Sequence, residues 1–296
     1  MKKLQILALS ILTTSLFAQI DLEISNGMTI ETTGGLEIEI SGDLIENGTG
    51  YLKGTVTSGN RSGGISSFAG LDLNGTNVDQ ITRTTGVDYN GATAPATLLR
   101  SYELKNSTWT TANVNFPFNS SGANDETNSL AEKYIYSDIG GTLKGYSDNN
   151  SEESLIKAAS VDISGSTPTN LFVSEGVGLD AKIYLEGPYN GGTMADNLGT
   201  LPTLSPYSEA PRTAVVPSEA IDWVLLEIRS TTDASSVVGY RSAFVDANGN
   251  IINDNAGING IGLPGVGGQD YYIVIKHRNH LPIMSNNSET FNWLTD

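Results

Sequence analysis

Short runs of alternating apolar and polar residues follow one another from residue 20 onward. The apolar positions of the first runs are Ile20, Leu22 and Ile24, then Met28 and Ile30, then Leu36, Ile38 and Ile40. A period of two is typical of a strand with one buried face. The pairs Asn26-Gly27, Gly34-Gly35 and Asn47-Gly48 tolerate positive φ and predict tight turns between the runs. Residues 20–53 are therefore predicted to form an N-terminal β-strand repeat, built as stacked rungs or as a meander.

Strand-like segments continue to the end of the chain. They are predicted at 70–73, 80–83, 97–104, 112–118, 133–137, 156–163 and 170–173, and then at 181–186, 220–229, 237–246, 250–253 and 271–278. Residues 223–226 are apolar without alternation, which predicts a strand buried on both faces. The stretch 201–217 carries four prolines and is predicted to be a surface loop. One short helix is weakly indicated at 127–132.

These elements predict an all-β protein in which the N-terminal strand repeat is followed by two β-sandwich-like modules. The first module is expected at residues 54–177 and the second at 178–296, with the boundary at 177–180. The sequence stops at Asp296 without a polar closing segment, which suggests that the second module is truncated.

The first nineteen residues have the layout of a secretory signal peptide. Lys2 and Lys3 form a basic start, residues 4–17 are mostly apolar, and Ala18 offers a small residue for cleavage. The apolar run is too short for a membrane span, and no later run approaches that length. The protein is therefore predicted to be extracellular or displayed on the cell surface, with no membrane span after the signal is removed.

Charge and cysteine content exclude several classes of function. The chain has 33 acidic and 16 basic residues, a net charge of −17. Such a surface repels nucleic acid, which needs a cationic footprint. There is no cysteine, so neither disulfides nor thiolate chemistry are available. Acidity is compatible with solubility outside the cell and with bound calcium, and solubility is the simpler explanation.

The segment from Asp246 to Asn250 starts like a calcium loop, with oxygen ligands at alternate positions. An EF-hand would need glycine at 251 and glutamate at 257, where this chain has Ile251 and Gly257. A hairpin turn with positive φ at Asn248-Gly249 is the favoured interpretation. A looser calcium site remains the metal candidate, with the ligands Asp246, Asn248, Asn250 and Asp254. The acidic loop at 148–153 is a weaker second candidate.

His277 and His280 are the only histidines. On a regular strand an offset of three residues places them on opposite faces, so a structural role is favoured over a metal site. The glycine-rich stretch 257–268 has no phosphate-binding pattern and is predicted to be a flexible loop. No G-x-S-x-G motif indicates a hydrolase. Trp109, Trp223 and Trp293 include candidates for stacking on sugars, although Trp223 is expected in the core.

Four blocks carry a resemblance to a known class of proteins. They are KIYLEGPYNGGTM (182–194), AIDWVLLEIR (220–229), VVGYRSAFVDANGNII (237–252) and YYIVIKHRNHLPIMS (271–285). In this order they resemble a module of large secreted bacterial surface proteins, adhesin-like or haemagglutinin-like, of the type IX secretion kind. The blocks DQITRTTG (79–86) and LLRSYELKNS (98–107) resemble a β-sandwich module of similar proteins. Such proteins usually continue to a C-terminal sorting domain; the sequence ends before one, which suggests either a fragment or a different secretion route.

The resemblance implies a non-enzymatic secreted or cell-surface protein that serves adhesion or structural display, without catalytic residues or a required cofactor. Its partner would be an extracellular protein or a glycan. The alternative is a carbohydrate-binding or polysaccharide-processing accessory module. A hydrolase ranks third, because no pair of carboxylates stands out among the many in the sequence.

Overall fold

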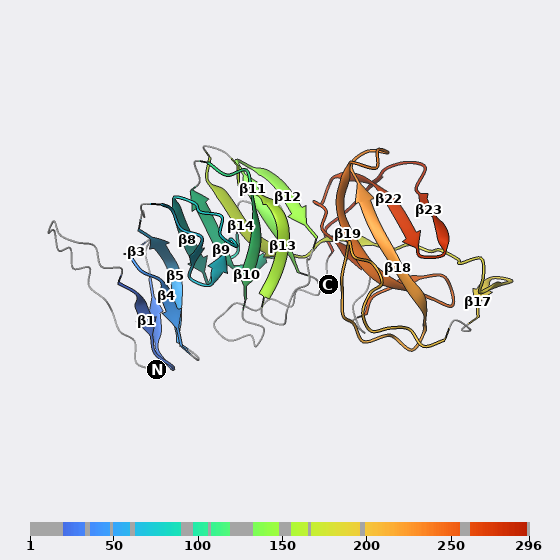
Figure 1. Cartoon of the computed structure of the whole chain (residues 1–296), viewed down its shortest axis with the longest axis horizontal. Coiled ribbons are helices and arrows are strands. Elements are labelled where there is room, and N and C mark those ends of the chain that lie inside the picture. Colours follow the sequence, from blue (N-terminus) through green and yellow to red (C-terminus); the bar gives the residue numbers. More distant parts are fainter. Residues whose placement is uncertain are drawn as a thin grey trace.

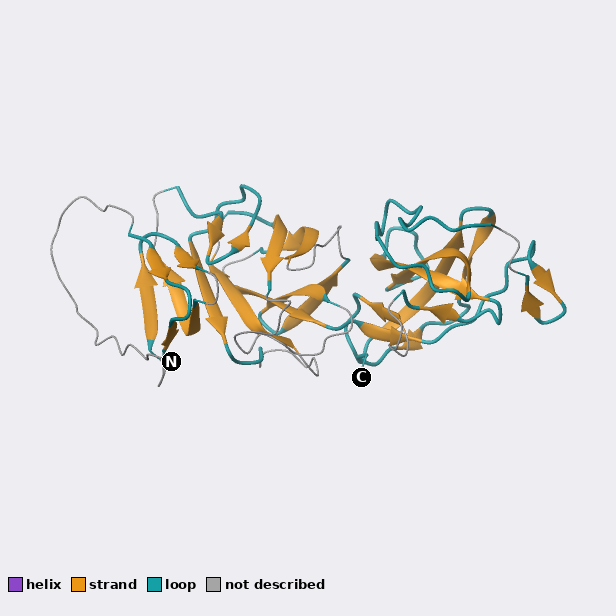
Figure 2. Ribbon diagram, turned by 90° about the horizontal axis from the view of Figure 1, so that it is seen from below, coloured by secondary structure: helices purple, strands orange, loops and turns teal. Residues whose placement is uncertain are grey.

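The computed structural model describes residues 20–32, 36–47, 50–59, 63–89, 97–105, 108–118, 133–147, 155–164, 167–195, 199–254 and 261–294. Within these ranges the chain forms twenty-four strands and no helix (Figures 1 and 2). The all-β prediction is therefore confirmed. The predicted signal peptide at 1–19, the helix at 127–132 and the acidic loop at 148–153 lie outside the described residues.

The N-terminal strands stack in parallel. β1 (Leu22–Ile24) pairs with β4 (Leu44–Glu46), while β2 (Thr29–Glu31) and β3 (Glu37–Ile40) both pair with β5 (Tyr51–Ser58). Parallel neighbours cannot be joined by a tight hairpin. The chain instead winds once and lays a second rung on the first, so the stacked-rung alternative is the correct one. Gly27, with φ of 77°, supplies the predicted turn between β1 and β2.

Two sheets enclose the first core, the cluster of buried apolar side chains between Ile24 and Val173. The larger sheet has the order β12-β11-β14-β9-β8-β5-β2, with β3 beside β5, and the smaller has the order β13-β10-β7-β6. The further strands are β6 (Ser67–Phe68), β7 (Leu71–Asp72), β8 (Gln80–Thr85), β9 (Thr97–Lys105), β10 (Thr111–Pro117), β11 (Tyr134–Ile139), β12 (Thr142–Tyr146), β13 (Leu155–Asp162) and β14 (Thr169–Ser174). The ring of Tyr102 in β9 meets Phe116 in β10 edge-on at 5.2 Å, so the sheets face each other.

The second core lies between Val177 and Phe291 and is built on a sheet with the order β20-β19-β18-β22-β23, in which β24 also pairs with β22. Its strands are β18 (Ala220–Arg229), β19 (Val237–Asp246), β20 (Ile251–Ile252), β22 (Asp270–His277), β23 (His280–Met284) and β24 (Glu289–Thr290). Two small pairs accompany it, β15 (Val177–Leu179) with β21 (Ile261–Leu263), and β16 (Tyr189–Asn190) with β17 (Thr193–Met194). Nine of the ten residues of β18 are buried, as its unbroken apolar run predicts.

One prediction for this part of the chain is wrong and another is incomplete. No strand forms at 181–186, where Lys182 makes only an isolated bridge to Asn250. The proline-rich stretch 201–217 forms no strand, but it is not simply a surface loop. Its residues Leu201, Tyr207 and Val216 pack against the buried cluster that contains Trp223 of β18 and Phe244 of β19. The segment can be partly buried because its backbone finds its own partners, for example Ser205 N to Arg212 O at 2.8 Å.

The two cores lie side by side along the longest axis of the molecule (Figure 1) and meet at a polar and aromatic joint. Tyr134 and Tyr136 of β11 donate hydrogen bonds to the carbonyls of Gly262 and Gly265, at 2.8 and 2.9 Å. Burial raises the pKa of Tyr136 well above its ordinary value, so this hydroxyl keeps the proton that it donates. Trp293 meets the Tyr136 ring edge-on at 5.6 Å.

Glycines make the joint possible. A Cβ on Gly267 would lie 2.3 Å from the Trp293 ring, so only glycine admits that ring. The stretch predicted to be a flexible loop therefore belongs, from residue 261 onward, to a strand and to the joint. Its residues 257–260 lie outside the described part of the chain.

Candidate functional site

Asp246 holds a hairpin turn together. Its Oδ1 accepts hydrogen bonds from the backbone N–H groups of Asn248 and Asn250, both at 2.8 Å, and its Oδ2 accepts one from the Asn250 side chain at 2.7 Å. Gly249 has φ of 81°, and β19 and β20 pair on either side of the turn. The favoured hairpin interpretation is confirmed, although the positive φ lies at Gly249 and not at Asn248.

Asp254, the fourth calcium candidate, faces two arginines. Its carboxylate accepts hydrogen bonds from Arg212 Nε and NH2, at 2.7 and 2.8 Å, and from Arg241 NH2 at 3.2 Å. These cations hold the pKa of Asp254 below its ordinary value, although burial opposes the shift. Within the described residues no three side chains of the usual ligand types gather where they could hold a metal ion. The calcium site stays a prediction, and its two carboxylates have protein partners.

His277 and His280 come together, contrary to the expectation of opposite faces. β22 ends at His277 and β23 begins at His280, so the chain reverses direction between them. Their Nδ1 atoms lie 2.8 Å apart, and His277 Nε2 lies 3.1 Å from Oδ2 of the buried Asp222. Arg278 NH2 donates to the same oxygen at 2.9 Å. The resulting chain of carboxylate and two imidazoles fixes the β22–β23 turn to β18.

This histidine pair predicts a pH dependence of stability. Burial, helped by His280 and Arg278, lowers the pKa of His277 below its ordinary value near 6.5, although Asp222 opposes the shift. Below pH 6.5 the unfolded chain therefore binds a proton before the folded chain does. The stabilisation is complete above pH 6.5 and is lost as the pH falls through the folded pKa. We expect the melting temperature to fall between pH 7.5 and 5, and to fall less steeply in His277→Gln. Equal slopes in the two proteins would contradict the prediction.

The three tryptophans that could stack on sugars differ in exposure. Trp223 is fully buried, as expected, and Trp293 lies in the joint between the cores. Trp109 is 48% exposed on the first core. Sequence analysis did not single out Tyr184 and Tyr189, which are 43% and 48% exposed and meet edge-on at 5.2 Å. No local sequence pattern indicates that these two rings meet.

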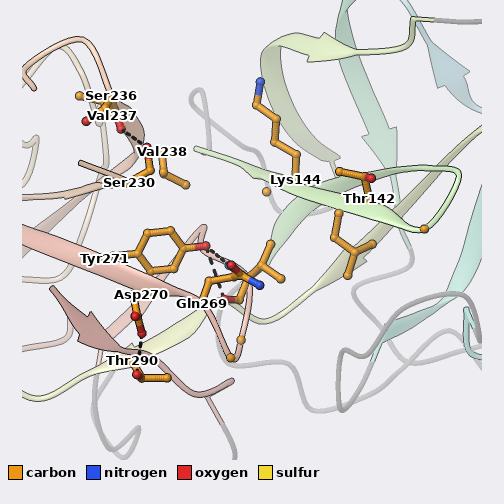
Figure 3. A pocket seen from close by; sticks show the side chains of 16 residues that line it. Thr142, Lys144, Ser230, Ser236, Val237, Val238, Gln269, Asp270, Tyr271 and Thr290 are labelled. Atoms are coloured by element: carbon orange, nitrogen blue, oxygen red, sulfur yellow. Dashed lines mark hydrogen bonds between the residues drawn. The ribbon is translucent and has the colours of Figure 1, made fainter.

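A cleft with a volume of about 980 Å³ lies beside the joint, between the two cores (Figure 3). The β11–β12 hairpin forms one wall with Thr142 and Lys144, and Tyr271 and Asp270 come from the second core. Asp270 accepts a hydrogen bond from the Thr290 hydroxyl at 2.6 Å. Lys144 pairs with Asp162 at 2.8 Å. The described lining includes no histidine or cysteine, so the cleft offers hydrogen bonds to a polar ligand but no nucleophile with an adjacent imidazole.

Comparison of the chain with protein-family models, with curated proteins and with solved structures finds no match in any of the three. Across the described ranges, no helix is long and apolar enough to cross a membrane.

Proposed function

We propose that this chain is a non-enzymatic secreted or cell-surface protein that holds an adhesive surface away from its point of attachment. In this proposal the stacked rungs and the first core form one part of a stiff rod. The second core forms the other part. The two cores are then two β-sandwich-like modules in a row. The signal-peptide pattern, the acidic surface and the resemblance of four sequence blocks to adhesin-like proteins support the location. The single observation that carries the mechanical role is the joint.

The joint is suited to resist bending because its contacts have fixed partners and directions. Each tyrosine hydroxyl donates to one particular backbone carbonyl, and the Trp293 ring sits where Gly267 leaves room. A hydrogen bond also links Tyr240 N in β19 to the Ser147 hydroxyl at 2.9 Å, so β19 takes part in the joint as well. Contacts spread over several segments restrict rotation about more than one axis. A flexible linker would leave the two cores free to rotate, which is the usual situation for small interfaces within a chain.

The experiment measures the distance between the cores directly. The chain lacks cysteine, so Val87→Cys with Leu281→Cys places two spin labels, one on each core, without background. Both positions are exposed. We expect a single narrow distance distribution by pulsed electron resonance. Tyr136→Ala with Trp293→Ala should broaden it, while Trp109→Ala should not. Protease treatment of intact cells should remove the protein.

A broad distribution in the chain with an intact joint would overturn the mechanical role. Protection of the protein inside intact cells would overturn the location.

A further inference from the structure

Two exposed tyrosines stand at one end of the molecule. The β16–β17 hairpin projects beyond the second core, at the end of the long axis opposite the N-terminal rungs (Figure 1). Tyr189 begins β16, and Tyr184 lies five residues earlier, with the two ring planes 66° apart. Between 180 and 195 these two are the exposed large apolar side chains. They form a short inclined pair of rings, here called the tyrosine step.

The hairpin beneath the tyrosine step is fixed to the second core. Ile183 N donates to Gly249 O at 2.8 Å, and Met194 N donates to Ala247 O at 2.7 Å. Leu185 and Met194 are buried, and Leu185 N donates to the Met194 sulfur at 3.1 Å. The rings therefore project from backbone that is hydrogen-bonded on both sides. Binding to them would require little further ordering, which lowers its entropic cost.

The Tyr184 ring lies over the β19–β20 turn. A Cβ on Gly249 would come within 3.0 Å of this ring, so the glycine lets the ring approach the turn closely. The adjacent Asn248 is exposed, and its side chain makes no hydrogen bond within the described part of the chain. The same holds for the Asn190 side chain and for the hydroxyls of both tyrosines. The turn beneath the Tyr184 ring thus carries an exposed amide at Asn248, and both tyrosine hydroxyls are open to a ligand.

We propose that the tyrosine step binds a pyranose ring of an extracellular glycan, which rests on the proposed adhesive function and names its ligand. One face of a pyranose presents C–H groups, which the electron-rich face of a tyrosine attracts. Sugar hydroxyls at the ring edge match the exposed amide of Asn248, which neighbours Gly249 under the Tyr184 ring and both donates and accepts. A peptide or helix would need a wider apolar surface than two rings provide.

The test presents the purified chain to an array of extracellular glycans, where multivalent display compensates for weak single-site binding. We expect binding to a subset of glycans. For those glycans in solution, Tyr184→Ala and Tyr189→Ala should each weaken binding at least tenfold. Tyr184→Phe should retain most of the affinity, because it keeps the ring face. The matched control is Trp109→Ala, which removes an equally exposed ring from the first core and should leave binding unchanged.

Both alanine variants change exposed side chains, and an unaltered melting temperature verifies that they fold. Absence of binding to every glycan on the array would overturn the proposal, as would binding that survives both alanine variants. The label distances across the joint are measured without any ligand. Failure of glycan binding with a narrow distance distribution would therefore reject the ligand and leave the rigid rod standing.

Discussion

Replacing Glu46 by alanine is expected to lower the free energy of unfolding of the first core by about 3–5 kcal/mol, the usual cost of breaking a buried ion pair. Glu46 at the end of β4 accepts two hydrogen bonds from Arg83 of β8, both at 2.9 Å. The side chain of Arg83 is 1% exposed. Without Glu46, its charge stays buried without a counter-ion in contact and keeps its hydrogen bond to the Leu52 carbonyl at 3.1 Å. The change should also loosen the N-terminal rungs.

Urea unfolding measures this effect, and hydrogen exchange of β8 assigns the transition to the first core. Glu46→Ala combined with Arg83→Met should recover much of the loss, because no unpaired charge then remains. The matched control is Lys144→Ala, which breaks an ion pair whose two side chains are 53% and 37% exposed. Pairs of that kind contribute less than about 1 kcal/mol. A loss as small in Glu46→Ala would contradict the prediction.

Replacing Trp223 by alanine is expected to cost the second core about 3–5 kcal/mol, as is usual for a buried aromatic residue. Trp223 is fully buried, and its ring lies 3.8 Å from that of Phe244, centroid to centroid. Its Nε1 donates to Pro202 O at 2.9 Å. The substitution would leave a cavity between β18 and the stretch 201–217, and would remove the hydrogen bond that holds this stretch down.

Two measurements separate these consequences. Urea unfolding should show the lower stability, and limited trypsin digestion should cut faster after Arg212, which lies in the loosened stretch. Trp109→Ala should change stability by less than about 0.5 kcal/mol, since its ring is exposed. Unchanged cleavage at Arg212 together with unchanged stability would show that Trp223 does not hold the stretch in place.

The positions of most strands were predictable from the sequence, but the pairing between strands was not. Alternation indicates where a strand has one buried face, and it located β8, β10 and β13 within a few residues. Alternation says nothing about which strands pair, because strands with parallel and with antiparallel neighbours show the same two-residue period of buried and exposed side chains. The parallel rungs of β1 to β5 emerge only when the chain winds back on itself. β23 was missed because Pro282 interrupts its pattern, although an edge strand tolerates proline.

The candidate sites divide in the same way. The residues Asp246 to Asn250 form a local turn, and a turn's backbone preferences can be assigned from its own residues. The sequence offered Asp254 as a calcium ligand, and only the fold shows that Arg212, which lies 42 residues away, pairs with it. His277 and His280 were assigned to opposite faces because the reversal between β22 and β23 was not anticipated.

By itself the sequence determined the all-β character, the burial of both faces of β18, the turn at Gly249, the acidic charge and the absence of thiol chemistry. These follow from residue type and from periods of a few residues, which act locally. Tertiary structure decided the rungs, the joint of Tyr134 and Tyr136 with the glycine-rich stretch, and the meeting of Tyr184 with Tyr189. The joint brings together residues 128 and 129 positions apart, and no local pattern encodes such a contact. It forms because two cores, each closed by its own sheets, find complementary donors and carbonyls where they meet.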